Sequence, residues 1–217
     1  MGSYDARFYD TIRAGTRQSA AVVVPLLIER LELGEGDTMI DVGCGEGWWA
    51  QTFTEHGIAA QGIDGAYVAS SPLGDRFTAA DLSKSILAIP NSFSLALSLE
   101  VAEHLPRARA QGFVRDLCRL APRVVFSAAI PGQGGTGHVN EQWPDYWAEL
   151  FEAEGFAVSG ALRFDIWNDD RIENWYRQNL LVAVPRDKVW WYPSLFDSST
   201  TPPFPMVHPV LYDARRR

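Results

Sequence analysis

A glycine-rich segment between an apolar run and a helical pattern limits the folds open to this chain more than any other feature. The segment reads Met-Ile-Asp-Val-Gly-Cys-Gly-Glu-Gly-Trp-Trp and covers residues 39–49. Its apolar start indicates a strand, the glycines at 43, 45 and 47 indicate a tight turn, and the next residues begin a helix. This order of elements presents backbone N–H groups to a ligand. The segment therefore predicts an α/β fold with a ligand at the turn.

The spacing of the three glycines separates two kinds of cofactor site. A dinucleotide-binding turn reads G-x-G-x-x-G, and its third glycine allows close packing around a pyrophosphate. Trp48 stands where that third glycine would be. The pyrophosphate fingerprint is missing, so a nicotinamide-dependent dehydrogenase is the least favoured function.

Composition favours one domain that acts on a small molecule. The chain has 217 residues, of which 47% are hydrophobic, and this is enough for one sizeable core. Its formal net charge is −8, whereas a domain that binds a duplex usually carries a basic face. The concentrated positive charge at residues 215–217 is interpreted as a solvated tail. Composition therefore favours a small-molecule substrate over nucleic acid, without excluding the latter.

Cysteine usage and hydropathy bear on the compartment. Cys44 and Cys118 lie in different expected elements without the spacing of a disulfide framework, which favours reduced thiols. The start of the chain is polar, and Pro25 interrupts the longest apolar run, so we expect neither a signal peptide nor a membrane span. These features predict a cytoplasmic protein.

Strands and helices alternate along most of the chain. The expected strands cover residues 38–43, 58–63, 76–80, 93–99 and 122–128, and the expected helices cover 47–56, 105–119 and 143–154. Pro106 and Pro144 suit the first turns of the last two helices, and Gly155 suits the end of the third. A strand over 156–167, a short helix over 170–177 and a strand over 179–184 follow. This alternation predicts a parallel sheet with helices on both faces.

Three parts are expected along the chain. Residues 1–36 form an N-terminal helical cap, whose periodicity over residues 6–33 is broken at Gly15 and Thr16. Residues 37–185 form the ligand-binding core. Residues 186–217 form an extension rich in proline and aromatic residues, too aromatic for a free linker. We expect the extension to pack on the core or on a partner subunit, which would allow a homodimer.

The segment from Asp41 to Gly47 resembles the first motif of class I S-adenosylmethionine (SAM) dependent methyltransferases. The resemblance extends over residues 37–185, because that family ends its sheet with an antiparallel hairpin like the one expected here. It implies a Rossmann-like fold with a mostly parallel seven-stranded sheet, an antiparallel last strand and helices on both faces. It also implies a transferase that uses SAM and releases S-adenosylhomocysteine (SAH).

The resemblance places cofactor contacts at successive strand ends. Asp64 ends the second strand about 20 residues after the turn, where an acid accepts hydrogen bonds from both ribose hydroxyls. Asp81 follows the third strand and resembles the acid that contacts the adenine amino group. For either acid alone, ordinary turn or cap chemistry is the simpler interpretation. The implied cofactor-binding residues are Asp41, Gly43, Cys44, Gly45, Gly47, Asp64, Gly65, Asp81, Leu82, Leu99 and Glu100.

A glycine-rich loop after the fifth strand carries the candidate catalytic groups. It covers residues 131–143 and contains four glycines followed by polar and aromatic residues, a pattern typical of substrate loops. His138 is the predicted general base because imidazole commonly exchanges protons near neutral pH. Glu141 is the reserve base, and His104 after the fourth strand is the third candidate. A backbone-bonded histidine and a helix-capping glutamate are the simpler alternatives.

An alternative set of residues would bind a metal. Glu100-x-x-Glu103-His104, followed by His138, is similar to small-RNA 3′-end 2′-O-methyltransferases, and ubiquinone-pathway O-methyltransferases share the first part. This resemblance implies that Glu100, Glu103, His104 and His138 bind Mg²⁺, which holds the acceptor hydroxyls. We favour the interpretation without a metal, since Glu103 and His104 also suit the start of a helix.

The sequence therefore favours a methyltransferase that acts on a small molecule. Oxygen is the favoured acceptor atom because no Asn/Asp-Pro-Pro-aromatic motif of amine methylation follows the fourth strand. Two alternatives stay open. One is metal-assisted methylation of an RNA end or a protein side chain, and the other is a SAM-binding protein without catalysis.

Overall fold

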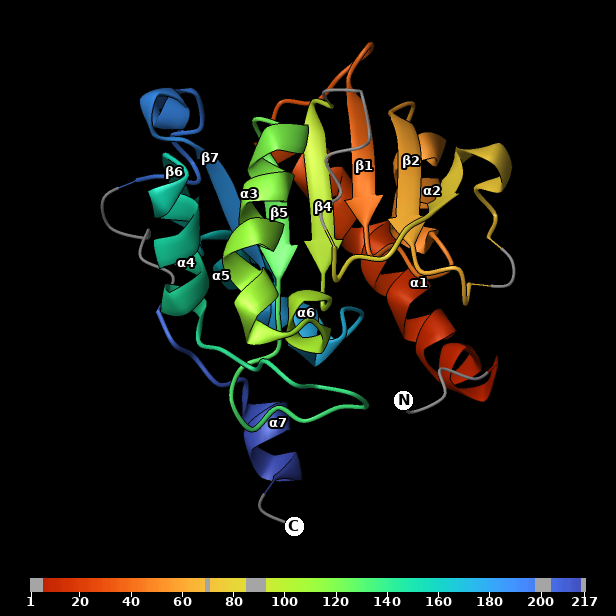
Figure 1. Ribbon diagram of the computed structural model, residues 1–217. Coiled ribbons are helices and arrows are strands. Elements are labelled where there is room, and N and C mark those ends of the chain that lie inside the picture. Colours follow the sequence, from red (N-terminus) through yellow and green to blue (C-terminus); the bar gives the residue numbers. More distant parts are fainter. Residues whose placement is uncertain (1–5, 69–70, 85–92, 198–203, 216–217) are drawn as a thin grey trace.

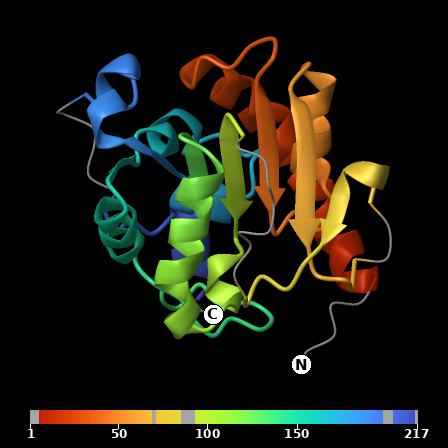
Figure 2. The same cartoon turned by 45° about the horizontal axis from the view of Figure 1, so that its top comes forward.

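A seven-stranded sheet forms the centre of the molecule (Figures 1 and 2). The computed structural model describes residues 6–68, 71–84, 93–197 and 204–215. The strand order is β3-β2-β1-β4-β5-β7-β6, and β7 runs antiparallel to both of its neighbours while β1 to β5 are parallel. The strands are β1 (Thr38–Val42), β2 (Ala59–Asp64), β3 (Phe77–Ala79), β4 (Leu95–Leu99), β5 (Val124–Ser127), β6 (Phe156–Ser159) and β7 (Leu181–Pro185). The predicted fold class is confirmed.

Helices cover both faces of this sheet. One face packs against α1 (Ala6–Arg30), α2 (Trp48–Glu55), α5 (Leu162–Ile166) and α6 (Asn174–Asn179). The other face packs against α3 (Ala110–Leu120) and α4 (Pro144–Ala153). A short helix, α7 (Pro209–Ala214), lies near the C-terminal end of the chain (Figure 1). None of the described helices is long and apolar enough to cross a membrane.

Strand β1 contributes side chains to the hydrophobic clusters on both faces of the sheet. Successive side chains of a strand point to opposite sides. Met39 accordingly belongs to the cluster under α1 and α2, whereas Ile40 and Val42 belong to the cluster under α3 and α4. Asp41 is 2% exposed, so an acid interrupts an otherwise apolar strand. Burial on both faces explains the nearly continuous apolar run that the sequence shows.

The strand expected over residues 156–167 is too long. Strand β6 ends at Ser159, and α5 begins at Leu162. Ser159 turns the chain there, because its hydroxyl donates to the Leu195 carbonyl and accepts from the N–H of Ala161. A side-chain oxygen that bonds the backbone two residues ahead offers the chain an alternative to the sheet ladder.

Two helix boundaries also differ from the prediction. Helix α3 begins at Ala110 rather than near Pro106, since Pro106 has an extended backbone and precedes a 3-10 turn at Arg107–Arg109. Helix α1 continues through Gly15, where a break was expected. A Cβ atom at Gly15 would lie 1.8 Å from Oε1 of Glu173, so this glycine leaves room for a neighbouring side chain instead of ending the helix.

The C-terminal segment contacts the core at several points. Arg163 donates to the Phe204 carbonyl at 2.9 Å, and the N–H of His208 donates to Oε1 of Gln178 at 2.7 Å. A 3-10 helix at Arg186–Trp191 directly follows β7 and packs Val189 against the cluster under α1. These contacts place the segment against the same chain that carries the sheet.

Candidate functional site

The candidate site lies at the edge of the sheet where the parallel strands β1, β2, β4 and β5 end (Figure 1). In open α/β sheets, ligands bind outside these carboxyl ends. The glycine turn follows β1, Asp64 ends β2, Glu100 follows β4, and the loop with His138 follows β5. The topology therefore gathers residues that are up to about a hundred positions apart in the sequence.

The glycine turn is held mainly by hydrogen bonds to the end of β2. Its N–H groups donate within the protein: Gly43 and Cys44 to the Ile63 carbonyl at 2.8 and 3.1 Å, Gly47 to the Cys44 carbonyl at 2.8 Å, and Gly45 to Oδ2 of Asp64 at 2.6 Å. This differs from the expectation that these groups face a ligand. The turn also needs small residues, because a Cβ atom at Gly43 would lie 2.3 Å from a Val101 methyl group.

Asp64 uses both carboxylate oxygens in this structure. Oδ2 accepts from Gly45, and Oδ1 accepts from the N–H of Gly65 at 2.6 Å and from the hydroxyl of Tyr67. Tyr67 is 56% exposed, and its ring lies over Gly65, where a Cβ atom would be 2.1 Å from the ring. Tyr67 was not among the residues predicted from the sequence. An aromatic hydroxyl three residues after the acid is the signal that would have suggested it.

Asp41 and Cys44 lie beneath the turn. Burial, together with the charge of Asp64, raises the pKa of Asp41 to about 8. Oδ2 of Asp41 accepts no hydrogen bond from the described residues. Burial also raises the pKa of the Cys44 thiol, which keeps it protonated and makes it a poor nucleophile. Both side chains therefore belong to the support of the turn.

The other implied cofactor residues fall into two groups. Asp81 is exposed and bonds within its own turn, accepting from the N–H and hydroxyl of Ser83 at 3.1 and 2.5 Å and pairing with Lys84. The bonds from Ser83 lower the pKa of Asp81. Leu82 and Leu99 are buried, at 7% and 8% exposure. Turn chemistry thus accounts for the contacts of Asp81 in this structure.

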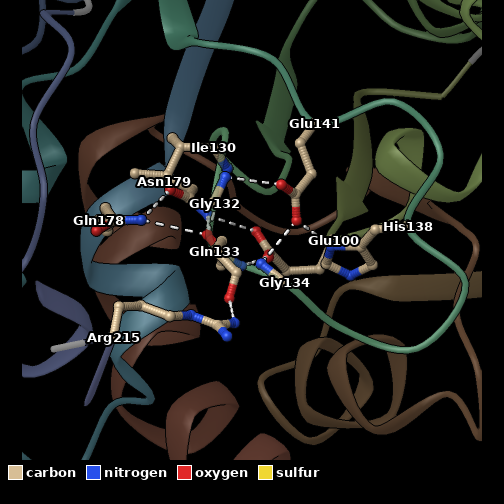
Figure 3. A network of polar contacts seen from close by, with 10 residues as sticks. All are labelled: Glu100, Ile130, Gly132, Gln133, Gly134, His138, Glu141, Gln178, Asn179 and Arg215. Carbon is tan, nitrogen blue, oxygen red and sulfur yellow. Dashed lines mark hydrogen bonds and ion pairs between the residues drawn. The ribbon is translucent and has the colours of Figure 1, made fainter. Parts of the chain in front are cut away.

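Glu100 has an unusual backbone and a fully bonded side chain (Figure 3). Its φ of 56° lies in the left-handed region. Oε2 accepts from Gln133 at 2.8 Å, and Oε1 accepts from Asn179 at 3.1 Å. Burial raises the pKa of this carboxyl, while the side-chain hydrogen bonds oppose the rise. Glu100 therefore joins the end of β4 to the loop after β5 and to α6.

Three buried amides complete this network, and the sequence analysis assigned none of them. They are Gln133, Gln178 and Asn179. Gln178 donates to Gln133 at 3.2 Å and to Asn179 at 2.9 Å, and Asn179 also donates to Gln133 at 2.9 Å. Two adjacent amides directly ahead of the apolar strand β7 were the available signal. Buried polar groups that satisfy one another hold their surroundings in one arrangement.

His138 and Glu141 form a hydrogen-bonded pair on the loop after β5. Nδ1 of His138 lies 2.8 Å from Oε1 of Glu141, and the N–H groups of Gly132 and Gly134 donate to the same carboxylate at 2.8 and 2.7 Å (Figure 3). Burial raises the pKa of Glu141, but the bonds from His138 and the glycine amides outweigh it, and the net pKa is lowered. An ionised Glu141 selects a proton on Nδ1 and leaves Nε2 as an acceptor.

His104 and Glu103 lie beside this pair. The rings of His104 and His138 meet edge to face, with centroids 4.8 Å apart. Burial and the neighbouring His138 lower the pKa of His104 to about 4, so His104 is neutral at pH 7. Glu103 is fully buried, and its carbonyl accepts from Val139 and Asn140 at 2.9 and 3.0 Å. Glu103 thereby fixes the two residues that directly follow His138.

The predicted metal set comes together only in part. Ligand atoms of Glu103, His104 and His138 all lie within 4.8 Å of one another. Glu100 is not in this group, and its oxygens accept hydrogen bonds from the amides of Gln133 and Asn179. Neither carboxylate oxygen of Glu103 accepts a hydrogen bond from the described residues, which fits a ligand role. One carboxylate and two imidazoles suit a transition metal better than Mg²⁺, which prefers oxygen ligands.

Comparisons with known proteins bear on the family and the fold. Residues 16–193 match the family model described as a methyltransferase domain. A segment of 114 residues is 37% identical to an uncharacterized methyltransferase of Mycolicibacterium paratuberculosis and covers 48% of this chain and 43% of that protein. The chain thus matches less than half the length of this curated relative.

Solved structures share the fold at low sequence identity. One is the magnesium protoporphyrin IX methyltransferase of Synechocystis with bound SAH, at 20% identity and a TM-score of 0.61, covering 85% of this chain and 90% of that one. Another is a putative O-methyltransferase of Nostoc punctiforme, at 14% identity and a TM-score of 0.61, covering 82% of this chain and 59% of that one.

Proposed function

The chain belongs to the methyltransferase domain family, and we propose that it moves the methyl group of SAM to an oxygen atom of a small molecule. The observation that carries this proposal is the His138–Glu141 pair, which lies at the same sheet edge as Asp64. Asp64 suits the ribose diol and His138 suits an acceptor hydroxyl. The two ends of the reaction therefore have candidate residues on neighbouring loops.

The donor set fits SAM. The Asp64 carboxylate at the end of β2 accepts a hydrogen bond from the hydroxyl of Tyr67. It can accept hydrogen bonds from ribose hydroxyls in the same way. Bound there, SAM supplies an electrophilic methyl group on a positively charged sulfur. Asp64 would orient the ribose, and the buried Asp41 would support the turn from below.

His138 is the proposed general base. Glu141 holds Nδ1–H, so Nε2 is directed to accept the proton that an acceptor hydroxyl loses as its oxygen attacks the methyl carbon. The charge of Glu141 then stabilises the imidazolium that forms, as a carboxylate does in a catalytic triad. His104, neutral beside His138, adds no competing positive charge.

A small-molecule acceptor is supported by charge and by likeness. The chain carries a net charge of −8, which disfavours a polyanionic substrate such as RNA. The similar solved structures include proteins named as a porphyrin methyltransferase and a putative O-methyltransferase. The first name gives a small molecule as that protein's acceptor, and the second gives oxygen as the acceptor atom.

The test measures cofactor binding and methyl transfer separately. SAH affinity is measured by calorimetry, and transfer from labelled SAM is measured with phenols, hydroxy acids and amines as acceptors. We expect His138→Ala to lower kcat at least about 100-fold, because it removes the general base. The dissociation constant for SAH should stay within about threefold, because His138 is outside the cofactor contacts. An equal loss in both quantities would mean that His138 shapes the pocket.

The gathering of Glu103, His104 and His138 also favours a second candidate, metal-assisted transfer. Excess EDTA separates the two. Activity that survives EDTA supports His138 as a base, whereas activity lost with EDTA and restored by a divalent cation supports the metal.

A further inference from the structure

The C-terminal segment of residues 204–215 contacts the loop that carries the proposed base. We propose that this segment forms the acceptor-side wall of the site and determines which acceptors the protein methylates. The inference rests on the proposed function, since it assigns a role in the same site. The family match ends at residue 193, so the wall is supplied by a part of the chain outside the family's common domain.

The segment holds Gln133 from two directions, and Figure 3 shows the one that comes from Arg215. The guanidinium of Arg215 donates to the backbone carbonyl of Gln133. The N–H of His208 donates to Gln178 at 2.7 Å, and Gln178 in turn donates to the side chain of Gln133 at 3.2 Å. Gln133 then donates to Glu100 at 2.8 Å. His208 and Arg215, near the two ends of the segment, are therefore both connected to Glu100 through Gln133.

Arg215 also lies against the support of the proposed base. A Cβ atom at Gly134 would be 2.1 Å from Nη2 of Arg215, so the guanidinium rests on this glycine. The N–H of Gly134 donates to Oε1 of Glu141, the same oxygen that lies 2.8 Å from Nδ1 of His138. The backbone of Gly134 thus lies between Arg215 and the His138–Glu141 pair. The solvated tail was expected over residues 215–217. Arg215 is exposed, as expected, but it also donates to the loop, and residues 216 and 217 lie outside the described residues.

His208 anchors the other end of α7. Its side chain is 5% exposed, with Nε2 lying 3.0 Å from the Trp167 carbonyl and Nδ1 accepting from the N–H of Val210 at 3.3 Å. These partners assign the proton to Nε2, which donates to Trp167. His208 and Arg215 bracket α7, so the whole helix is fixed beside the loop after β5 (Figure 1).

The contacts favour a role toward the acceptor rather than toward SAM. The bonds of the segment that are described above go to the loop after β5, to α6, to α5 and to the residue that follows α5. The loop after β5 carries the proposed base, whereas Asp64 and the glycine turn are bonded to one another. A wall at this place limits the size of the molecule that reaches Nε2 of His138.

The test compares the intact chain with Arg215→Ala, with His208→Ala and with a chain that stops before residue 204. Arg119→Ala, an exposed arginine on α3, is the matched control. Three quantities are measured: the dissociation constant for SAH, amide hydrogen exchange of residues 131–141, and kcat/KM for phenol and 1-naphthol, which share a hydroxyl and differ in size.

We expect SAH affinity within about twofold of the intact chain and exchange of the loop faster by about tenfold or more, because the loop loses its outer bonds. The ratio of kcat/KM for 1-naphthol to phenol should rise by about fivefold or more in the chain without the wall. Where neither acceptor reacts, the exchange result decides.

Two results would overturn the inference alone: loop exchange unchanged by loss of the segment, or SAH affinity that falls as much as transfer does. Failure of the intact chain to bind SAH would overturn the proposed function, and this inference with it.

Discussion

At the scale of single residues, the hydroxyl of Tyr67 donates to Asp64, the acid that we propose accepts hydrogen bonds from the ribose of SAM. Its hydroxyl bonds Oδ1 of Asp64, while backbone N–H groups of Gly45 and Gly65 bond the same carboxylate. The backbone donors are fixed by the fold, but an exposed side chain can rotate away. A ligand hydroxyl therefore competes with Tyr67 for the Asp64 carboxylate. The apparent affinity for the ligand is lowered in proportion to the fraction of molecules in which Tyr67 leaves Asp64 accessible.

Tyr67→Phe removes the competing hydroxyl and leaves the ring. We expect it to lower the dissociation constant for SAH by about threefold to tenfold, because the competing state disappears. Calorimetric titration with SAH measures this. Tyr212→Phe, at a similarly exposed tyrosine on α7, is the control that should change nothing. Weaker binding by Tyr67→Phe would show that the hydroxyl contacts the ligand instead.

Asp41 predicts a pH dependence of stability. Its pKa is about 8 in the folded chain and ordinary in the unfolded chain, so between about pH 4 and 8 the folded state binds one proton more. Stability conferred by this group is therefore present at low pH and is lost as pH rises, by about 1.4 kcal/mol per pH unit.

The measurement that checks this is urea unfolding at pH 5, 6 and 7. The free energy of unfolding of the wild type, minus that of Asp41→Asn, should fall as pH rises. A difference that stays constant would mean that Asp41 is ionised in the folded state.

The residue scale also shows what the sequence could predict about the site. The glycine turn, Asp64 and the loop with His138 were predicted because a strand end followed by special residues is a local pattern. Gln133, Gln178 and Tyr67 were missed because their roles come from partners far away in the sequence. No local pattern encodes a bond between α6 and a loop 45 residues earlier.

At the scale of elements, packing between β2 and the glycine turn requires Gly62. A Cβ atom there would lie 2.6 Å from Leu73 and 2.7 Å from Sγ of Cys44. We expect Gly62→Ala to lower the free energy of unfolding by about 1–3 kcal/mol, because the added methyl group overfills a packed space.

Urea unfolding measures this loss. Gly34→Ala is the matched control, since nothing lies within 4 Å of a Cβ atom at that position. Equal stability of Gly62→Ala and Gly34→Ala would mean that β2 and the turn can separate without cost.

Elements were predicted well where periodicity decided them and less well where distant contacts did. The strands near residues 38–43 and 122–128 appear within two residues at each end, because an apolar run can be recognised without knowing its partners. The bend at Ser159 depends on the Leu195 carbonyl, and the continuity of α1 at Gly15 depends on Glu173. Both partners lie far along the chain, so propensity alone gave the wrong boundary.

At the scale of the whole molecule, the two hydrophobic clusters share the strands of one sheet. Neighbouring residues of β1 and β4 alternate between the two clusters. If these strands unfold on one face of the sheet, the cluster on the other face is exposed to water as well. We expect one cooperative transition, with urea midpoints from tryptophan fluorescence and far-ultraviolet circular dichroism equal within about 0.2 M.

Separate midpoints would show that the faces unfold independently. The control is the chain that stops before residue 204, whose two midpoints should also agree, because the segment removed belongs to neither cluster. The division into residues 1–36, 37–185 and 186–217 stays a prediction, as does a homodimer formed through the last part.

Glu100 carries a consequence for anyone who selects this protein for heat resistance. A side chain with a φ of 56° costs about 1 kcal/mol relative to glycine at the same place. A screen that rewards survival alone would therefore favour glycine or asparagine at position 100. Either change would also remove the carboxylate that connects Gln133 and Asn179. Thermostable variants collected without an activity assay should accumulate changes at this position and lose the order of the active-site loop.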